Sequence, residues 1–462
     1  MSAGIGALGS LGVATETTPL VAVSPTITIP INSESFKADR TAIPSSSIVG
    51  DSMVQAVAAG VSVCEGGFNM EVEGSVAGQA IWLWSGNNGY THAAITGFAT
   101  VAPTGITAAT GGTLANGAYK YAASSVYTRT NDSVNIIFPS TATSLAVTAA
   151  GSGISINTIT FTAPGAVTGY TAIGTIIWRT IAAGSVLGFL AYQSGSGTSF
   201  ADDGTFDPVA NFSTVPYTAS LYGHTMVGSP PVSGDRLTPF TVTVNHDNDL
   251  SQQFITCRMD SMKLGVSGLD DKLMGDFTAK GAAAGTLANV SPSFVPLEPM
   301  IGWHCVIQIN GAADQTLESF EINCSNGVQV VPGMRGVPFN RDTISGMRKI
   351  SGQMTRQFAT TAVWSQMLAG LDFSLYFTSY GQCIANPTLS GVTSTMAHCA
   401  ITAIPFQYYI QITLPRCKLN KAGGNITSPD RIIETVAFDA FKDPVTATDM
   451  KIVIQNTTIS YT

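Results

Sequence analysis

A chain of 462 residues is long for a single hydrophobic core and predicts two or three domains. Charged residues make up only 11% of the chain and apolar residues 45%, so we expect much of the surface to be covered by partners or built from Thr, Ser, Gly and Asn. The net charge of −8 excludes a strongly attractive DNA-binding surface, because affinity for phosphate comes from clustered Lys and Arg.

Three features of the sequence bear on where the protein is made. No Lys or Arg precedes Lys37, whereas a secretory signal needs a positive start, so secretion is not expected. The most apolar long window, 173–192, is interrupted by Arg179 and by three glycines, which argues against a membrane span. The seven cysteines follow no framework pattern and predict reduced thiols in a protein made in a cytosol.

In chain order, the first informative stretch is segment 29–50, in which two extended runs flank a solvated corner. Pro30 and Pro44 stand where a strand can spare an N–H, so we expect edge or end strands here and no helix. Such a segment is suited to pair with another chain. The residues predicted to make that contact are Ile29, Ile31, Asp39 and Arg40.

The first block of strands continues to about residue 101. Period-two alternation over 66–77 predicts a half-buried strand. The apolar run 81–84 closes the block, and we expect Trp82 and Trp84 to lie in the core.

The amino-acid composition changes between residues 102 and 206, where the chain contains only one Lys and two Arg. Short β-branched runs alternate with Gly, Pro and Asn turns, which predicts a small inserted all-β sandwich. The matching stretches are 103–105, 114–121, 131–133, 159–164, 169–170, 177–179 and Asp202-Asp-Gly204. In these the insert resembles a fibronectin type III-like or immunoglobulin-like module, with several extra residues between Tyr170 and Trp178.

Residues 207–462 return to alternating strands and polar turns. One helix is predicted at 360–369, where Trp364, Met367 and Leu368 form an apolar stripe and Gly370 supplies a stop. We expect Trp364 to lie in the core. The prediction is therefore a mainly β host domain, residues 1–101 and 207–462, with one flanking α-helix, interrupted by the insert at 102–206.

Several short motifs follow one another in the host segments. They are Gly12-Val-Ala-Thr-Glu-Thr17, 29–35, Asp39-Arg40, 48–50, 67–71, 254–261, 306–310, 317–323 and 348–352. By their order and spacing, and by the helix at 360–369, the chain resembles the tail tube (major tail) proteins of long-tailed bacteriophages. Thr256 stands where these proteins usually have Gly.

This resemblance implies a β-sandwich or barrel subunit that assembles as rings of six, stacked into a hollow tube in the virion tail. Each subunit would give strands to a continuous inner barrel, and loops or arms would contact the next ring. Closure and stacking would also remove exposed sheet edges.

The implied partners are further copies of the chain, the tape measure protein, and the tail terminator and tip proteins. DNA would pass in transit without specific binding, because carboxylates repel phosphate. No cofactor and no membrane are implied. The insert, 102–206, would project outward as a decoration, with host surface glycans as a candidate contact.

The densest basic group contains Arg341, Arg348, Lys349 and Arg356. Two interpretations remain open for it. These side chains could pair across rings with acids such as Asp270, Asp271 or Asp276, or they could form a solvated face, since isolated surface ion pairs contribute only about 0–1 kcal/mol.

Signals for catalysis or metal binding are weak. Gly50-Asp-Ser52 resembles the start of an esterase block, but an extended run follows and no positioned His and Asp are evident. His304-Cys305 and His398-Cys399 could offer one inward zinc ligand each, because adjacent strand residues point to opposite faces. The oxygen-rich turns 246–249 and 202–204 lack a full set of calcium ligands, and Asx turns explain them.

The sequence thus predicts a structural, non-enzymatic protein of the phage tail. Two alternatives stay open: a surface adhesin or receptor-binding protein built from immunoglobulin-like modules, and an esterase that uses Ser52.

Overall fold

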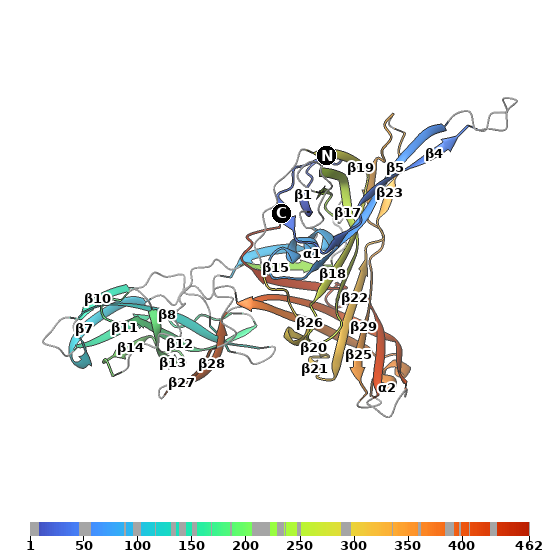
Figure 1. Ribbon diagram of the computed structural model, residues 1–462. Helices are drawn as coiled ribbons and strands as arrows, with labels where there is room; N and C mark the ends of the chain where they lie inside the picture. The colour runs from blue at the N-terminus through green and yellow to red at the C-terminus, as the bar shows by residue number, and fades with distance from the viewer. Residues whose placement is uncertain are drawn as a thin grey trace.

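The computed structural model describes residues 9–45, 57–86, 89–95, 103–115, 117–130, 135–137, 145–149, 155–167, 169–184, 187–205, 222–228, 235, 237–246, 251–287, 297–334, 336–358, 362–383, 392–396, 399–405, 407–425 and 432–461. This part of the chain is mainly β, which confirms the predicted fold class (Figure 1). It contains two α-helices where the sequence predicted one.

The largest sheet passes through strands that neighbour one another in the order β4, β5, β18, β17, β22, β25, β30, β29, β26 and β20. Their bounds are β4 Lys37–Pro44, β5 Val57–Glu71, β18 Met274–Gly281, β17 Ser251–Val266, β22 Leu317–Ser325, β25 Lys349–Gln357, β30 Ile433–Ala440, β29 Gln407–Asn425, β26 Asp372–Cys383 and β20 Cys305–Ile309. The short strands β3 (Ser33–Glu34) and β21 (Ala312–Ala313) pair with β5 and β20.

Two adjacent cross-strand rows explain why this sheet has one apolar and one polar face. The apolar row consists of Phe68, Phe277, Met262, Cys324, Ile350, Ala440, Cys417 and Phe373, all buried or packed against the core. Each of its members is followed or preceded in the chain by a member of the polar row, which consists of Asn69, Asp276, Lys263, Asn323, Ser351, Asp439, Lys418 and Asp372. Because successive strand residues point to opposite faces, this alternation fixes the register of the whole sheet.

Further strands extend the main sheet by pairing with β17 and β29. β1 (Ser10–Thr15) lies between β2 (Ile27–Ile29) and β16 (Phe240–Asn245), and both β16 and β19 (Ala283–Leu287) pair with β17. β31 (Lys451–Asn456) joins β29 to β15 (Tyr222–Val227), which pairs with β6 (Tyr90–Ala94). A separate hairpin pairs β23 (Gln329–Val331) with β24 (Asp342–Ile344), and a 3-10 turn spans Gly302–His304.

The unpredicted helix, α1, spans Ala77–Ser85 and is buried along its whole length. Its first turn is capped by Glu73, whose carboxylate accepts hydrogen bonds from the backbone N–H groups of Ser75, Val76 and Ala77. Burial raises the pKa of Glu73, and these hydrogen bonds oppose the rise. The apolar run 81–84, expected to close the first block of strands, is therefore helical, and Trp82 and Trp84 lie in the core as predicted.

The predicted helix is confirmed as α2, Ala362–Ala369. It ends where Gly370 adopts a positive φ of 62°, the usual conformation after a helix C-terminus. The prediction that Trp364 is a core residue was wrong, because its side chain is 44% exposed. The helix instead turns Val363 toward the core.

The strands between residues 103 and 202 form two sheets of their own, which lie to one side of the main sheet in Figure 1. One holds β7 (Pro103–Leu114), β11 (Ser155–Phe161) and β14 (Ser199–Asp202). The other holds β8 (Gly117–Arg129), β9 (Asn135–Ile137), β10 (Leu145–Ala149), β12 (Tyr170–Thr180) and β13 (Leu187–Ser194). Side chains from both sheets share one core cluster, including Leu114, Tyr121, Ile159 and Ile177.

A hairpin from far along the chain adds to this unit. β27 (Val392–Met396) pairs with β28 (Cys399–Pro405), and β28 runs parallel to β9. The unit therefore includes backbone from outside 102–206, the range predicted for the insert. The likeness of the unit to a fibronectin or immunoglobulin module stays a prediction.

The two main-sheet strands on either side of range 102–206 are neighbours. β6 precedes this range in the chain and β15 follows it, and the two pair directly, with Tyr222 opposite Ala94. Close chain ends let an inserted unit fold without distorting its host. Side-chain contacts join the units: the Arg129 guanidinium lies 3.7 Å from the ring centroid of Tyr380, and the Tyr170 hydroxyl lies 3.3 Å from Gln455 Oε1.

Candidate assembly surfaces

A two-stranded arm extends from one end of the main sheet (Figure 1). It consists of β4 and the outer half of β5, residues 57–63, which pair antiparallel with Pro44 opposite Val57 and Asp39 opposite Val63. In the described part of the chain β4 pairs with no strand except β5. An isolated two-stranded hairpin is marginally stable in water, so such an arm is suited to bind something.

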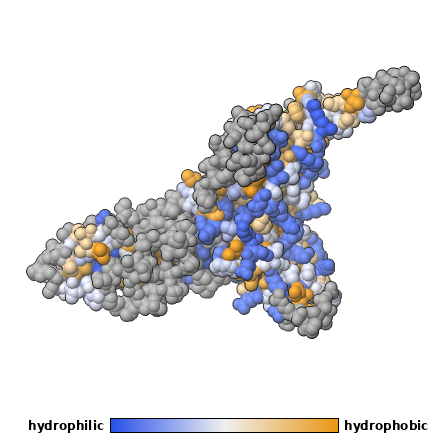
Figure 2. All heavy atoms as spheres, in the orientation of Figure 1, coloured by the Kyte–Doolittle hydropathy of each residue, from blue (hydrophilic) through white to orange (hydrophobic). Residues whose placement is uncertain are grey.

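The outer arm is apolar and exposed on both of its sides. Its exposed apolar residues, which together we call the arm face, are Ala42, Pro44, Val57 and Ala59 on one side and Val61 and Val63 on the other, because the strand register shifts between Arg40 and Ala42. Val57 is 60% exposed and Val61 is 46% exposed. Figure 2 shows hydrophobic residues gathered along this projection. An exposed group of apolar side chains of this kind is typical of a protein interface.

Charged residues mark the base of the arm. Lys37 Nζ lies 2.8 Å from an Asp39 carboxylate oxygen and 3.6 Å from one of Glu65. The hydrogen bond from Lys37 to Asp39 and the charge of Asp39 raise the pKa of the lysine. Asp39 and Arg40, both predicted contact residues, are exposed on β4.

The arm is braced where it leaves the body. The Ser62 N–H donates to the Pro338 carbonyl at 2.9 Å, and Asn340 Nδ2 donates to the Ser62 carbonyl at 3.0 Å. Phe36, just before β4, packs on Phe254 with ring centroids 5.2 Å apart. The arm therefore projects from a fixed base.

The two isoleucines predicted as contacts lie elsewhere. Ile29 has no exposed area and stands opposite Leu11 in the core, so in this structure it has no surface to offer a second subunit. Ile31 is half-buried against the same core.

The basic group divides between surface and interior. Arg341 and Lys349 are exposed. Arg348 is largely buried: it donates to the Ser85 carbonyl at 3.0 Å, lies 3.4 Å from Asp449, and its guanidinium lies 4.9 Å from the Trp84 ring centroid. It therefore stabilises the end of α1 within the subunit.

Arg356 is also used within the subunit. It donates to Asp314 at 2.8 Å and lies 3.5 Å from Glu434. Burial raises the pKa of Glu434, and the positive charge of Arg356 opposes that rise. Of the acids proposed as partners across rings, Asp270 and Asp271 are exposed, whereas Asp276 accepts a hydrogen bond from Asn69 within the subunit.

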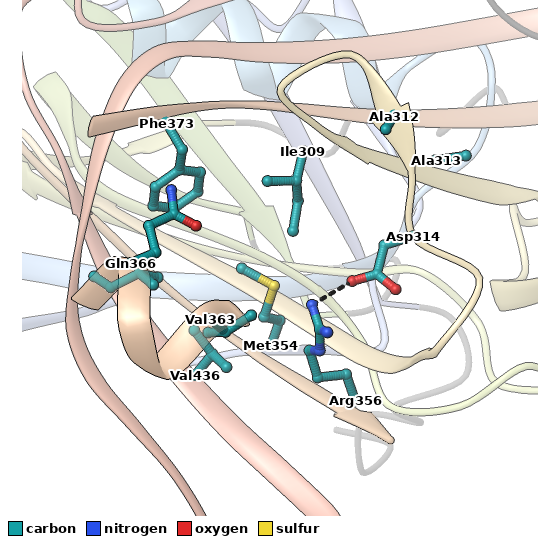
Figure 3. Close-up of a pocket in the computed structure, with 11 residues that line it drawn as sticks. Ile309, Ala312, Ala313, Asp314, Met354, Arg356, Val363, Gln366, Phe373 and Val436 are labelled. Atoms are coloured by element: carbon teal, nitrogen blue, oxygen red, sulfur yellow. Dashed lines mark hydrogen bonds and ion pairs between the residues drawn. The ribbon is translucent and has the colours of Figure 1, made fainter. Parts of the chain in front are cut away.

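The Arg356–Asp314 pair stands at one side of a pocket beneath α2, shown in Figure 3. The pocket has a volume of about 250 Å³. Apart from the ion pair, its lining is mostly apolar: Ile309, Met354, Val363, Phe373, Leu419 and Val436. The subunit thus has a mostly apolar pocket at this end.

The outer face of α2 is apolar as well. Trp364 is 44% exposed, Leu368 is 69% exposed, and Leu371, just after the helix, is 58% exposed. Residues four apart on a helix lie on the same side, so Trp364 and Leu368 present a joint surface, which we call the α2 face together with Leu371. The helix therefore has apolar side chains toward the core and toward solvent.

The predicted chemical signals acquire structural explanations where they are described. Asp202 accepts hydrogen bonds from Arg179, Tyr121 and the Gly204 N–H, and it is buried, so its oxygens are already occupied by the protein. His304 packs on Trp303 with ring centroids 3.7 Å apart. Burial raises the pKa of the neighbouring Cys305 to about 11.

The remaining candidates fall outside the described residues. These are the Gly50-Asp-Ser52 stretch, residues 247–249 and His398. Among the residues that the structure describes, no three His, Cys, Asp or Glu side chains are placed to hold a metal ion.

One buried site joins two of the sequence motifs. Glu16 accepts hydrogen bonds from the Thr256 N–H at 2.7 Å, from Thr256 Oγ1 at 2.8 Å and from Thr241 Oγ1 at 2.7 Å. Thr256 has a positive φ of 54°, a conformation that Gly adopts at little cost and Thr does not. The carboxylate thus holds in place a threonine at the position where the sequence resemblance expects glycine.

Exposed apolar surfaces at two ends of a well-packed β body are typical of a protein that assembles with other chains. The family model described as "phage tail tube protein" matches residues 6–440. The chain therefore belongs to the phage tail tube protein family, whose members are structural components of the virion tail and assemble within it. No curated protein matches the sequence significantly. None of the helices in the described residues is long and apolar enough to span a membrane.

Proposed function

We propose that this protein assembles as rings of six, and that the rings stack into the hollow tube through which DNA leaves the capsid. The observation that carries the proposal is the arm: an exposed apolar hairpin, fixed at its base, whose β4 strand pairs only with β5 in the described residues. Burial of that surface against another copy would supply the binding free energy, since apolar burial contributes about 25 cal/mol per Å².

The charge of the chain supports the proposed passage of DNA. At −8 overall, the subunit has more carboxylates than cationic side chains, so a tube built from it would repel phosphate and let DNA slide. The tape measure protein and the terminator and tip proteins are the further partners we propose. The insert stands to one side of the host body in Figure 1, which suits an outward decoration; contact of this unit with host glycans stays a prediction.

The test is electron microscopy of the purified full-length protein. Wild type should form hollow tubes with six-fold rings, a lumen wide enough for a DNA duplex and outward knobs from the insert. A double variant of the arm face, V57D/V61D, should remain unassembled with an unchanged circular dichroism spectrum. Its matched control is Ile181→Asp, because Ile181 is an apolar residue of similar exposure, 64%, located in the insert.

Two results would contradict the proposal at separate points. Tubes with another symmetry would contradict the rings of six. Tubes formed by V57D/V61D as readily as by wild type would show that the arm does not drive assembly.

A further inference from the structure

One row of host side chains faces the insert. Tyr380 on β26 stands opposite Tyr409 on β29, and Tyr409 stands opposite Gln455 on β31. Residues directly opposite one another on paired strands have their side chains on the same face. We call these three residues the host row. The same row continues to Gly223 on β15 and Ala93 on β6, the two strands that flank the insert in the chain.

The insert presents a matching pair of side chains. Arg129, at the end of β8, stands directly opposite Tyr170, at the start of β12, and we call these two residues the insert pair. The Arg129 guanidinium lies 3.7 Å from the ring centroid of Tyr380, and the Tyr170 hydroxyl donates to Gln455 Oε1 at 3.3 Å. The two members of the insert pair therefore contact the two ends of the host row.

Burial indicates that this contact excludes water. Arg129 is 6% exposed, and Tyr380 and Tyr409 are each 7% exposed. The Tyr380 and Tyr409 ring centroids lie 5.5 Å apart, and the Tyr127 ring packs edge-on against Tyr170 from the insert side. The attraction between a guanidinium and an aromatic ring is stronger where water is excluded. Arg129 is thus the anchor of the contact.

Backbone from the host crosses to the insert as well. The host strands β26 and β29 pair as far as Cys383 opposite Gln407, and between them in the chain stand β27 and β28, which we call the strap. β28 runs parallel to β9, with Ile404 opposite Ile136, and β9 pairs with β8. Figure 1 shows the strap beside the strands of the insert. The host therefore adds strands to the sheet that carries Arg129.

Relative motion is the usual expectation for two units of one chain unless the contact between them is extensive. Here the paired strands β6 and β15, the strap and the insert pair all connect the insert to the host. We infer that the insert is docked on the host row as part of one rigid body, and that Arg129 fixes its angle. The insert is then a fixed extension of the subunit. The inference concerns a single chain and does not depend on the proposed tube.

The test measures a distance between insert and host by pulsed electron paramagnetic resonance. Spin labels are attached to unnatural amino acids at Ile181 in the insert and Leu269 in the host, which are 64% and 63% exposed. The full-length labelled chain is diluted into excess unlabelled chain, so that each signal comes from within one chain. Wild type should give one narrow distance distribution. Arg129→Ala and Tyr380→Ala should each broaden it about twofold or more, because the insert regains motion.

Two further variants separate docking from folding. Lys120→Ala removes another cation of β8, one whose side chain is exposed, and should leave the distribution narrow. Tyr170→Phe removes the hydroxyl that contacts Gln455 and keeps the ring, so it should broaden the distribution less than Arg129→Ala. If Arg129→Ala unfolds the insert, as judged by circular dichroism, Tyr170→Phe decides the question: an unchanged distribution in that variant would overturn the inference.

Two other outcomes would overturn it. A broad distribution in wild type would show that the insert moves freely on its connections. Narrow distributions in both Arg129→Ala and Tyr380→Ala would show that the host row does not set its angle. A narrow wild-type distribution in a protein that forms no tubes would count against the proposed function alone, so the two failures are distinguishable.

Discussion

The two halves of strand β5 differ in almost every respect except their backbone conformation. The inner half, residues 64–71, pairs on both sides and buries Cys64, Phe68 and Met70. The outer half, residues 57–63, pairs only with β4 among the described strands beyond its base, and exposes Val57, Val61 and Val63. One continuous strand is thus a core element at one end and a free surface at the other.

This difference indicates which part of the strand stabilises the subunit and which part is available for a partner. Apolar side chains of the inner half are already removed from water, so their burial contributes to folding. Those of the outer half still face water in the single subunit. We therefore expect substitutions along β5 to change from folding defects to assembly defects at about Ser62.

The largest effect should come from the inner half. Phe68 is buried and stacks on Phe277 with ring centroids 5.1 Å apart. Phe68→Ala should lower the free energy of unfolding by about 3–5 kcal/mol, the usual cost of emptying a packed aromatic site. Urea denaturation followed by circular dichroism measures it. Val63→Ala is the matched control on the outer half, and an equal loss in both variants would contradict the comparison.

The sequence predicted the features of these strands that follow from neighbouring residues, but not those that depend on pairing with distant parts of the chain. The alternation over 66–77 is enough to predict the inner half as a strand with one buried face. It is not enough to separate Ile29, in the core, from its neighbours in segment 29–50. A three-residue apolar strand followed by an exposed one has the same pattern whether the short strand packs inside or outside, and only the pairing of Ile29 with Leu11 decides between them.

For the two helices, too, the sequence predicted only part of the structure. α1 was missed because Val76, at its N-cap, has no side-chain atom to accept a hydrogen bond from the first turn, and Glu73 further back accepts it instead. α2 was found, yet its apolar residues surround it, so the sequence could not tell that Val363 faces inward and Trp364 outward. The α2 face, the second surface of the candidate site, was missed for that reason.

The Glu16–Thr256 site should show the next largest effect. Glu16→Gln replaces one accepting oxygen by a donor and leaves a buried N–H or hydroxyl of Thr256 without a partner, which costs about 1–3 kcal/mol. Thr256→Gly should cost less than Thr256→Ala, because glycine adopts the positive φ of 54° without strain. Thermal unfolding of the three variants measures the order. A Gly variant less stable than the Ala variant would contradict this account.

A smaller, pH-dependent effect should arise where the C-terminal segment meets the body. Buried His224 lies with Nδ1 3.0 Å from the Tyr90 hydroxyl and Nε2 2.9 Å from the Thr458 carbonyl, and its ring stacks on Tyr461 at 4.3 Å. Burial lowers the pKa of His224 below its usual value of 6.5, against the opposing hydrogen bonds to Asn456 and Thr458.

The sign of that effect follows from proton linkage. Below about pH 6.5, His224 binds a proton in the unfolded chain but stays neutral in the folded chain. The stability present at neutral pH is therefore lost as the pH falls toward the lowered pKa. Unfolding free energies measured between about pH 7 and about pH 5 should fall less steeply in His224→Phe than in wild type. His246→Gln, an exposed position, serves as the control and should keep the wild-type slope. An unchanged slope in His224→Phe would contradict the assignment.

The smallest effect on the subunit should come from the outer half of β5. Val57→Thr keeps a β-branched side chain at a position that is 60% exposed, so the free energy of unfolding should change by no more than about 0.5 kcal/mol. The same substitution should raise the protein concentration at which tubes first form, because the hydroxyl must be dehydrated when the arm face is buried. Chemical denaturation and sedimentation, run on one preparation, measure both quantities. A loss of subunit stability near that of Phe68→Ala, with no change in the assembly threshold, would mean that β5 is a core strand along its whole length and that the arm face is not an interface.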